Sequence, residues 1–142
     1  MERNVLLHIK GIQRYEGNGP EAIELSTEGR LFREKDCLVL TYEESELTGL
    51  EGTTTRFELR PDNVRLIRTG KVRSVMEFIP GQTNQSLYDT GMGALLGTSR
   101  TLKIRDEMGE DGGNLSVTYH INIENLGAGE IEYAIVATPL GE

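Results

Sequence analysis

Apolar and polar residues alternate along most of this chain, which is the pattern of β-strands with one buried face. The clearest example is the segment NLSVTYHINIEN, residues 114–125, in which one face carries Leu115, Val117, Tyr119, Ile121 and Ile123 and the other carries polar residues. The segment EIEYAIVAT, residues 130–138, repeats the alternation after a glycine-rich turn, so the two segments predict a hairpin. No segment holds an apolar stripe of helical period for three turns, and the pattern therefore predicts an all-β protein.

The same alternation predicts ten strands, and the segments between them carry the glycine, proline, aspartate and asparagine residues typical of turns. The predicted strands are 4–15, 21–33, 37–47, 53–60, 64–69, 72–79, 83–90, 94–107, 114–125 and 130–138. Consecutive antiparallel strands joined by short turns lie side by side, and closing such a meander removes its exposed edges. We therefore expect a single domain over residues 1–142, folded as an antiparallel up-and-down β-barrel of about 8–10 strands.

The glycines of SLYDTGMGALLGTSR, residues 86–100, raise the possibility of a phosphate-binding loop. A Walker loop needs a lysine and a hydroxyl after its last glycine, and no lysine follows Gly97. The dinucleotide fingerprint also fails, because counting from Gly91 and Gly93 places Leu96 where the third glycine belongs. The spacing favours a structural role, in which these glycines turn the chain between two strands.

Charge and cysteine content limit the possible partners and the compartment. The 142 residues include 23 acidic and 15 basic side chains, a formal net charge of −8, which repels nucleic acids and anionic membranes. The apolar patch near the amino terminus is too short for a signal peptide or a membrane span. A single cysteine, Cys37, cannot form an internal disulfide, as expected in a reducing compartment. We expect a cytoplasmic protein that has neither nucleic acid nor a membrane as its partner.

Residues suited to catalysis or metal binding are few. The two histidines, His8 and His120, and Cys37 show no spacing typical of a metal site. His120 falls on the polar face of its strand, which favours a solvated side chain. The acidic segment from Asp106 does not match a calcium loop, because Met108 stands at the third position and Asp111 at the sixth. We expect neither a metal nor a cofactor.

The basic segment RPDNVRLIRTGKVR, residues 60–73, is the most suggestive candidate for a binding site. Most of this cluster fits the solvated outer face of a hairpin. Arg68, however, follows Val64 and Leu66 at a spacing of two, which predicts that it points into the barrel near the end of its strand. An inward arginine can bind a carboxylate or phosphate, since its planar group donates two parallel hydrogen bonds. Arg73 is the predicted second anchor.

An inward carboxylate is predicted close to these arginines. Tyr42 and Glu44 share a face with Leu38 and Leu40, so Glu44 points into the barrel or lies at its rim. A buried carboxylate needs a cationic partner, because an unpaired buried charge costs several kcal/mol, on the order of the stability of a whole domain. Aromatic residues predicted to supply the apolar walls of a ligand site are Tyr42, Phe57, Phe78 and Tyr88.

Several segments together resemble a known family. They are TYEE, LTGLEGTTTRFEL, IRTGKVRSVMEFIPG, SLYDTGMGAL and LSVTYHINIEN, which cover nearly the whole chain. In combination they resemble the YwiB-like family of small uncharacterised bacterial proteins. The resemblance implies a calycin-like barrel, similar to those of lipocalins and fatty-acid-binding proteins, and it supplies no catalytic residues and no known activity.

Three hypotheses of function follow from these observations. The leading one is a non-enzymatic protein that binds a small amphipathic or anionic molecule at the barrel mouth through Arg68 and Arg73. The second is a protein–protein interaction module with a filled barrel. The third is a small hydrolase-like enzyme that uses Glu44 or His120 with an arginine. A cavity with an inward arginine would support the first, whereas a filled interior and a large exposed apolar patch would support the second.

Overall fold

The computed structural model describes residues 2–15, 17, 19–124 and 127–140, and ten β-strands form its framework. Their bounds are β1 Glu2–Tyr15, β2 Glu21–Glu34, β3 Cys37–Glu43, β4 Thr53–Leu59, β5 Val64–Gly70, β6 Ser74–Phe78, β7 Thr83–Asp89, β8 Ala94–Gly109, β9 Gly112–Ile123 and β10 Gly127–Pro139. The described residues contain no helix with the length and apolar character needed to cross a membrane.

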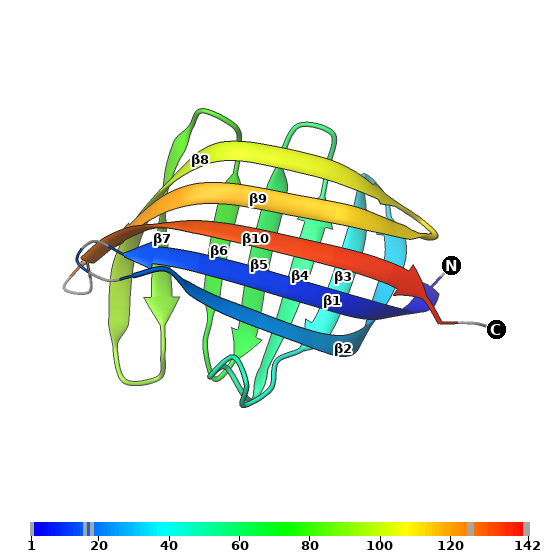
Figure 1. Ribbon diagram of the computed structural model, residues 1–142, viewed down its shortest axis with the longest axis horizontal. Helices are drawn as coiled ribbons and strands as arrows, with labels where there is room; N and C mark the ends of the chain where they lie inside the picture. The colour runs from blue at the N-terminus through cyan, green and yellow to red at the C-terminus, as the bar shows by residue number, and fades with distance from the viewer. Residues whose placement is uncertain (1, 16, 18, 125–126, 141–142) are drawn as a thin grey trace.

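All ten strands belong to one antiparallel sheet, in the order β6-β5-β4-β3-β2-β1-β10-β9-β8-β7. Each strand pairs with its neighbour in sequence except at one place, between β6 and β7. The first and last strands in sequence, β1 and β10, pair with each other at the middle of this order, from Val5 opposite Pro139 to Tyr15 opposite Gly129. Figure 1 shows β1, β2, β8, β9 and β10 crossing over the shorter strands β3 to β7, so that the sheet encloses an interior. The predicted all-β, antiparallel up-and-down barrel is confirmed.

The barrel is not fully closed, which differs from the complete closure expected from the sequence. β6 and β7 meet at one isolated bridge, where the Arg73 and Asp89 backbones exchange hydrogen bonds of 2.8 and 2.9 Å. We call the strip between these two strands the seam. The chain passes from β6 to β7 through Ile79–Gln82, where the Gly81 amide donates to the Thr101 carbonyl on β8 rather than to β6. The seam is therefore the one interruption of the ladder among the described strands.

Most strand boundaries agree with the alternation of residues, and the largest error is in the third strand. It was predicted to reach residue 47, but β3 ends at Glu43. The backbone turns here because the amides of Thr48 and Gly49 donate to the carbonyls of Ser45 and Glu46. Gly49 has a φ of 77°, a conformation that favours glycine. Residue 125, the last of the predicted strand 114–125, lies outside the described residues.

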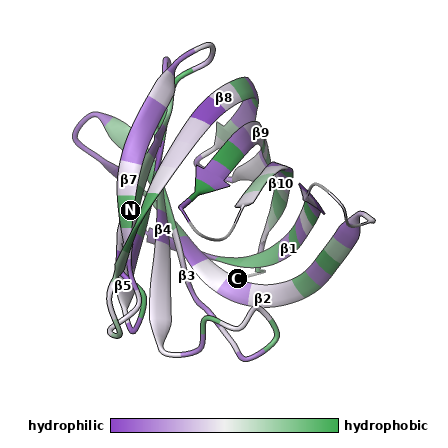
Figure 2. Ribbon diagram, turned by 90° about the vertical axis from the view of Figure 1, so that its left-hand side faces the viewer, coloured by the Kyte–Doolittle hydropathy of each residue, from purple (hydrophilic) through white to green (hydrophobic). Residues whose placement is uncertain are grey.

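The inward side chains fill one end of the barrel, which holds the core. Figure 2 shows hydrophobic and hydrophilic bands alternating along strands such as β2 and β9. The largest fully buried side chains come from both layers of the barrel and include Leu7, Leu31, Leu40, Phe57, Leu66, Phe78, Leu115 and Ile135. On the outer face, Arg56 and Arg60 bind Glu58 at 2.9 and 3.1 Å. Arg60, the first residue of the basic segment, therefore lies on the outer face, where it is partly buried against Glu58.

Two glycines on the inward face of β1 and β2 provide a test of this packing. A Cβ added at Gly29 would lie 2.6 Å from the Thr41 carbonyl oxygen and 2.7 Å from Leu7 Cδ1, whereas one added at Gly11 meets nothing within 4 Å. Gly29→Ala should lower the free energy of unfolding by about 1–3 kcal/mol through overpacking. Gly11→Ala should raise it by up to about 1 kcal/mol, because alanine loses less backbone entropy on folding. Urea denaturation of both variants measures the difference, and equal stabilities would contradict the packing described here.

Candidate functional site

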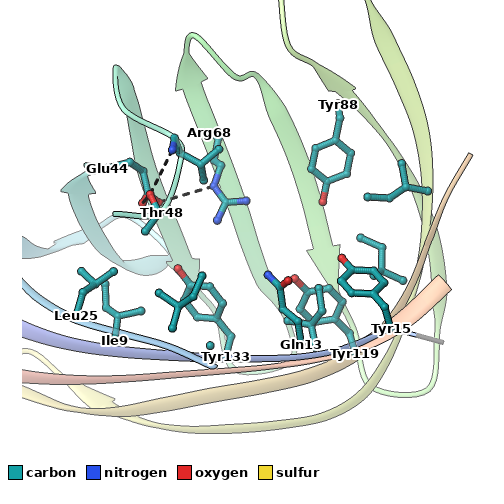
Figure 3. A pocket seen from close by; sticks show the side chains of 16 residues that line it. Ile9, Gln13, Tyr15, Leu25, Glu44, Thr48, Arg68, Tyr88, Tyr119 and Tyr133 are labelled. Carbon is teal, nitrogen blue, oxygen red and sulfur yellow. Dashed lines mark hydrogen bonds and ion pairs between the residues drawn. The ribbon is translucent and has the colours of Figure 1, made fainter. Parts of the chain in front are cut away.

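The end of the barrel opposite the filled core contains a cavity of about 290 Å³. Its walls come from the second half of β1, the first half of β2, the adjoining parts of β9 and β10, the segment between β3 and β4, and one residue each of β5 and β7. The lining residues are Ile9, Gly11, Gln13, Tyr15, Ile23, Leu25, Glu44, Thr48, Leu50, Arg68, Tyr88, Tyr119, Ile121, Ile123, Ile131 and Tyr133. Figure 3 shows Arg68 and Glu44 on one side of this space and a group of tyrosines around it. The interior is therefore only partly filled by the protein's own side chains.

Arg68 reaches the cavity because it continues the inward face of β5 after Val64 and Leu66, both of which are buried. Its side chain is only 12% exposed. Its Nε atom is buried and has no hydrogen-bond partner among the described residues. Burial disfavours the charge on Arg68, but the oxygens of Tyr133, Tyr42 and Glu44 outweigh this effect, and the pKa of the guanidinium is raised. Arg68 is therefore a permanently charged side chain in the wall of the cavity.

Glu44 lies directly after β3 and balances this charge. Its side chain is 1% exposed, and its Oε2 atom lies 3.9 Å from Arg68 Nε. The carboxylate accepts hydrogen bonds from the hydroxyls of Thr48, at 2.9 Å, and Thr55. The threonines thus satisfy the oxygens of Glu44, while the distance to Arg68 exceeds that of a hydrogen bond. The pair is neutral overall, and Figure 3 shows Nε of Arg68 facing Glu44 while the end of the guanidinium points away from it, toward the tyrosines.

All five tyrosines of the chain gather at this cavity. Four of them line it, and the fifth, Tyr42, has its hydroxyl 2.6 Å from that of Tyr133. The hydroxyl of Tyr88 donates to Met76 Sδ at 2.9 Å. A tyrosine presents an apolar ring and a polar hydroxyl, so this arrangement gives a wall of mixed character.

Burial changes the ionisation of four of these tyrosines. It raises the pKa of Tyr88 and Tyr119, which leaves both hydroxyls protonated well above the usual range. Burial also raises the pKa of Tyr42 and Tyr133, and the nearby Glu44 carboxylate adds to the effect. The four hydroxyls therefore remain neutral hydrogen-bond donors under ordinary conditions.

The residues that the sequence singled out as a ligand site fall into three groups. Arg68, Glu44 and Tyr88 line the cavity, and Tyr42 reaches it through its contact with Tyr133. Phe57 and Phe78 are fully buried in the core and do not belong to the lining. They pack behind it, with ring centroids 5.7 Å from Tyr133 and 4.7 Å from Tyr119 respectively. Arg73 is exposed at the bridge to Asp89 and is not brought together with Arg68 in the cavity.

Other lining residues were not identified as site residues from the sequence. Tyr119 and Tyr133 stand on the apolar faces of their strands, where each hydroxyl carries a polar group into an otherwise apolar interior. Such inward tyrosines are the signal that could have identified them. Thr48 lies outside any strand, so no periodicity indicates that its hydroxyl bonds Glu44.

The histidines lie outside the barrel. His120 is exposed, as predicted. His8 Nε2 lies 2.6 Å from Glu24 and His8 Nδ1 lies 3.4 Å from Ser26, but all three side chains stand on the exposed outer face of β1 and β2. Across the described part of the chain, no group of three or more His, Cys, Asp or Glu side chains is placed to hold a metal ion.

Comparison with known proteins agrees with this architecture. Residues 7–135 match the family described as domain of unknown function DUF1934. The uncharacterised β-barrel protein YwiB of Bacillus subtilis is 25% identical over 122 residues, which cover 86% of this chain and 84% of that protein. The crystal structure of the ywiB protein from Bacillus subtilis aligns with a TM-score of 0.87 and 24% identity, over 99% of this chain and 94% of that chain. The chain therefore belongs to the DUF1934 family, and its resemblance to YwiB-like proteins is confirmed.

Proposed function

We propose that this protein binds a small amphipathic anion inside the hollow end of its barrel. The observation that carries the proposal is Arg68, a largely buried cation that lines the cavity and whose only ion-pair partner among the described residues, Glu44, lies beyond hydrogen-bond distance at 3.9 Å. Buried polar groups are normally hydrogen-bonded, and an anion in the cavity can accept hydrogen bonds from the terminal nitrogens of this guanidinium.

The hydrogen-bond donors of the lining, rather than its net charge, support an anion as this ligand. Glu44 neutralises Arg68 at a distance of 3.9 Å, and its oxygens are occupied by Thr48 and Thr55. A carboxylate, sulfonate or phosphate in the cavity can accept short, charge-assisted bonds from the planar guanidinium. The tyrosine hydroxyls around the cavity can donate further hydrogen bonds to the same group.

The rest of the lining supports a ligand with an apolar part. Ile9, Leu25, Ile121 and Ile131 form walls without hydrogen-bonding side chains. At about 290 Å³ the space lies at the small end of the range of roughly 300–1,000 Å³ that is typical of ligand sites. The ligand is therefore compact. The calycin-like character expected from the sequence supports the same proposal, because small up-and-down barrels can hold one small molecule.

The geometry favours binding over the two other hypotheses. An interaction module with a filled barrel does not require an interior cavity. A hydrolase would need an acid or base free to exchange protons with a substrate, whereas Glu44 is held by two threonines and His120 points outward. We place the protein in the cytoplasm, which is supported by the single buried cysteine, Cys37.

Binding of the fluorescent anion anilinonaphthalene sulfonate tests this proposal. Arg68→Gln should weaken binding roughly a hundredfold, because the sulfonate loses its charged donor inside the barrel. Gly11→Leu should weaken binding to a similar degree, because its side chain enters the cavity without altering any charge. Fluorescence titration measures both affinities, and native mass spectrometry shows whether the protein carries a small molecule from its own cells.

The matched control is Arg65→Gln, which removes an arginine from the outer face of the same strand. Arg65 pairs with Glu58 and Glu77 and does not line the cavity. This variant should bind the sulfonate like the natural protein. Equal affinities for all four proteins, with their folds verified by circular dichroism, would exclude the interior site.

The buried tyrosines predict a loss of stability in alkali. Their pKa values lie above the unfolded value of 10.0, so their contribution to stability is complete below pH 10 and declines as the pH rises above it. Each tyrosine should lower the free energy of unfolding by about 1.4 kcal/mol per pH unit in that range. Urea denaturation at increasing pH, followed together with tyrosinate absorbance, measures this slope.

Tyr119→Phe isolates one residue, because it keeps the ring and removes the ionisable proton. Its stability should decline less steeply above pH 10, by about 1.4 kcal/mol per pH unit, than that of the natural protein. Identical slopes for the two proteins would show that Tyr119 ionises without unfolding.

A further inference from the structure

The first half of β2 has a strand partner on one side only. β2 pairs with β1 over residues 21–32, but it pairs with β3 only over residues 29–34, because β3 ends at Glu43. Residues 21–28 therefore form a margin of the sheet, which we call the β2 edge. Figure 1 shows β2 as the lowest of the long strands that cross over the barrel.

The even-numbered residues of the β2 edge direct their backbone groups away from β1. The Leu140 amide donates to the Asn4 carbonyl at 3.1 Å, so the even-numbered residues of β1 are hydrogen-bonded to β10. The odd-numbered residues of β1 are then hydrogen-bonded to β2, where they stand opposite odd-numbered residues. This leaves the amides and carbonyls of Ala22, Glu24 and Ser26 on the outer side of the ladder. None of these groups is hydrogen-bonded to another described residue.

The interior side of the β2 edge is apolar and uncovered. Ile23 and Leu25 line the interior cavity, yet Ile23 is 41% exposed, since no strand lies beside this part of β2. A strand added here brings its own inward side chains next to these two residues. Apolar side chains at those positions would leave water on binding.

The outer face of the β2 edge is acidic. Glu24 and Glu28 stand on it with Ser26 between them. The partner of Glu24 is His8, at 2.6 Å, and no lysine or arginine of the described residues forms an ion pair with either carboxylate. Side chains of an added strand lie directly opposite these positions, with their Cβ atoms about 4.5–5.5 Å away. Lysine or arginine there would form cross-strand ion pairs.

The same carboxylates disfavour a second copy of this chain at the β2 edge. Two such edges paired antiparallel about a two-fold axis at Ser26 would place Glu24 directly opposite Glu28, and like charges in that position are destabilising. The formal net charge of −8 repels another copy at long range and attracts a basic chain. The charges therefore indicate a different, basic partner.

The second half of β8 extends beyond β7 and forms a comparable margin, but it is less suited to a guest strand. Its register against β9 shifts between Thr101 and Lys103, and the Asp106 side chain accepts a hydrogen bond from the Met108 amide at 3.0 Å. Such irregularities turn an edge away from incoming strands. The β2 edge has a continuous register against β1 and contains no proline.

We propose that the β2 edge binds an extended basic segment of another protein, which adds a strand to the sheet. The segment carries lysine or arginine opposite Glu24 and Glu28, alternating with apolar residues that face the interior. Backbone hydrogen bonds to the even-numbered residues of the edge supply affinity, and the alternating side chains select the partner. The inference does not involve Arg68 and is independent of the proposed function.

Two synthetic peptides of equal length test this inference. Acetyl-VKVTVKV-amide matches the β2 edge, and acetyl-VEVTVEV-amide places glutamates opposite Glu24 and Glu28. The natural protein should bind the basic peptide roughly tenfold more tightly, because opposite charges attract across a strand pair and like charges repel. Isothermal titration calorimetry measures both affinities, and equal affinities overturn the inference.

Amide hydrogen exchange separates strand pairing from attraction between charges. At saturation with the basic peptide, exchange should slow roughly tenfold or more at Ala22, Glu24 and Ser26, whose amides gain partners. Exchange at Ile23 and Leu25 should stay unchanged, because these amides already donate to β1. Nuclear magnetic resonance measures each amide separately, and protection that is absent or does not alternate overturns strand addition.

Ser26→Pro removes the central amide of the edge without removing a hydrogen bond to β1, and proline is tolerated on a strand edge. It should weaken binding of the basic peptide roughly tenfold. The matched control is Ser26→Ala, which loses the same hydroxyl but keeps the amide and should bind like the natural protein. Equal affinities for the two variants, both folded by circular dichroism, contradict the inference.

A second pair of variants decides the matter if Ser26→Pro does not fold. Glu24→Gln combined with Glu28→Gln should lose the preference for the basic peptide. Glu130→Gln combined with Glu132→Gln changes the net charge equally on the outer face of β10, where both carboxylates pair with Arg14, and should keep the preference. Equal loss in both double variants would show attraction to net charge alone and overturn the inference.

The remaining outcomes separate this inference from the proposed function. Arg68→Gln should bind the basic peptide like the natural protein. Failure of the peptide to bind, while anilinonaphthalene sulfonate binds in an Arg68-dependent way, overturns only the inference, and the reverse result overturns only the proposed function. Alternating protection without peptide, together with a dimer in analytical ultracentrifugation, would place a second copy at the edge and also overturn the inference.

Discussion

The pairing of β1 with β10 is the interaction on which the rest of the structure depends. Most of the other strand pairs are hairpins between neighbours in sequence, but this pairing joins strands from opposite ends of the described chain. Bringing such distant segments together costs chain entropy, which the ladder from Val5–Pro139 to Tyr15–Gly129 and the shared core must offset. Once this pairing joins the two halves of the sheet, alternate side chains of each strand face the interior and the exterior of the barrel. Arg68 and Glu44 are buried as a consequence.

The difference between the two ends of the barrel arises from particular inward residues. At the filled end, Leu7 on β1 packs closely enough against Gly29 on β2 that a methyl group would not fit. Four residues further along β1, Gly11 has open space where a side chain would stand. The neighbouring inward positions carry tyrosines and Arg68, whose polar ends resist close apolar packing. The same strands therefore build a core at one end and a cavity at the other.

Much of this fold could be predicted from the sequence because two-residue alternation depends only on local geometry. It indicated the ten strands, their meander and the inward position of Arg68, and it placed Glu44 inside the barrel or at its rim. The seam could not be predicted, since the short Ile79–Gln82 turn resembles those of true hairpins and the separation of β6 from β7 depends on the curvature of the whole sheet. The grouping of Tyr15, Tyr88 and Tyr133 was also beyond local patterns, because these residues lie on separate strands whose distances depend on closure.

An interrupted ladder exposes backbone groups that could recruit a strand from another molecule, and the seam limits this hazard. β6 is only five residues long, and charged side chains flank or occupy it at Arg73 and Glu77. The Asn84 side chain donates a hydrogen bond to the Glu77 carbonyl, and the Asp89 backbone is hydrogen-bonded to both the amide and the carbonyl of Arg73. Few consecutive backbone groups remain for an incoming chain. The barrel can thus stay incompletely closed while its edges resist self-association into fibrils.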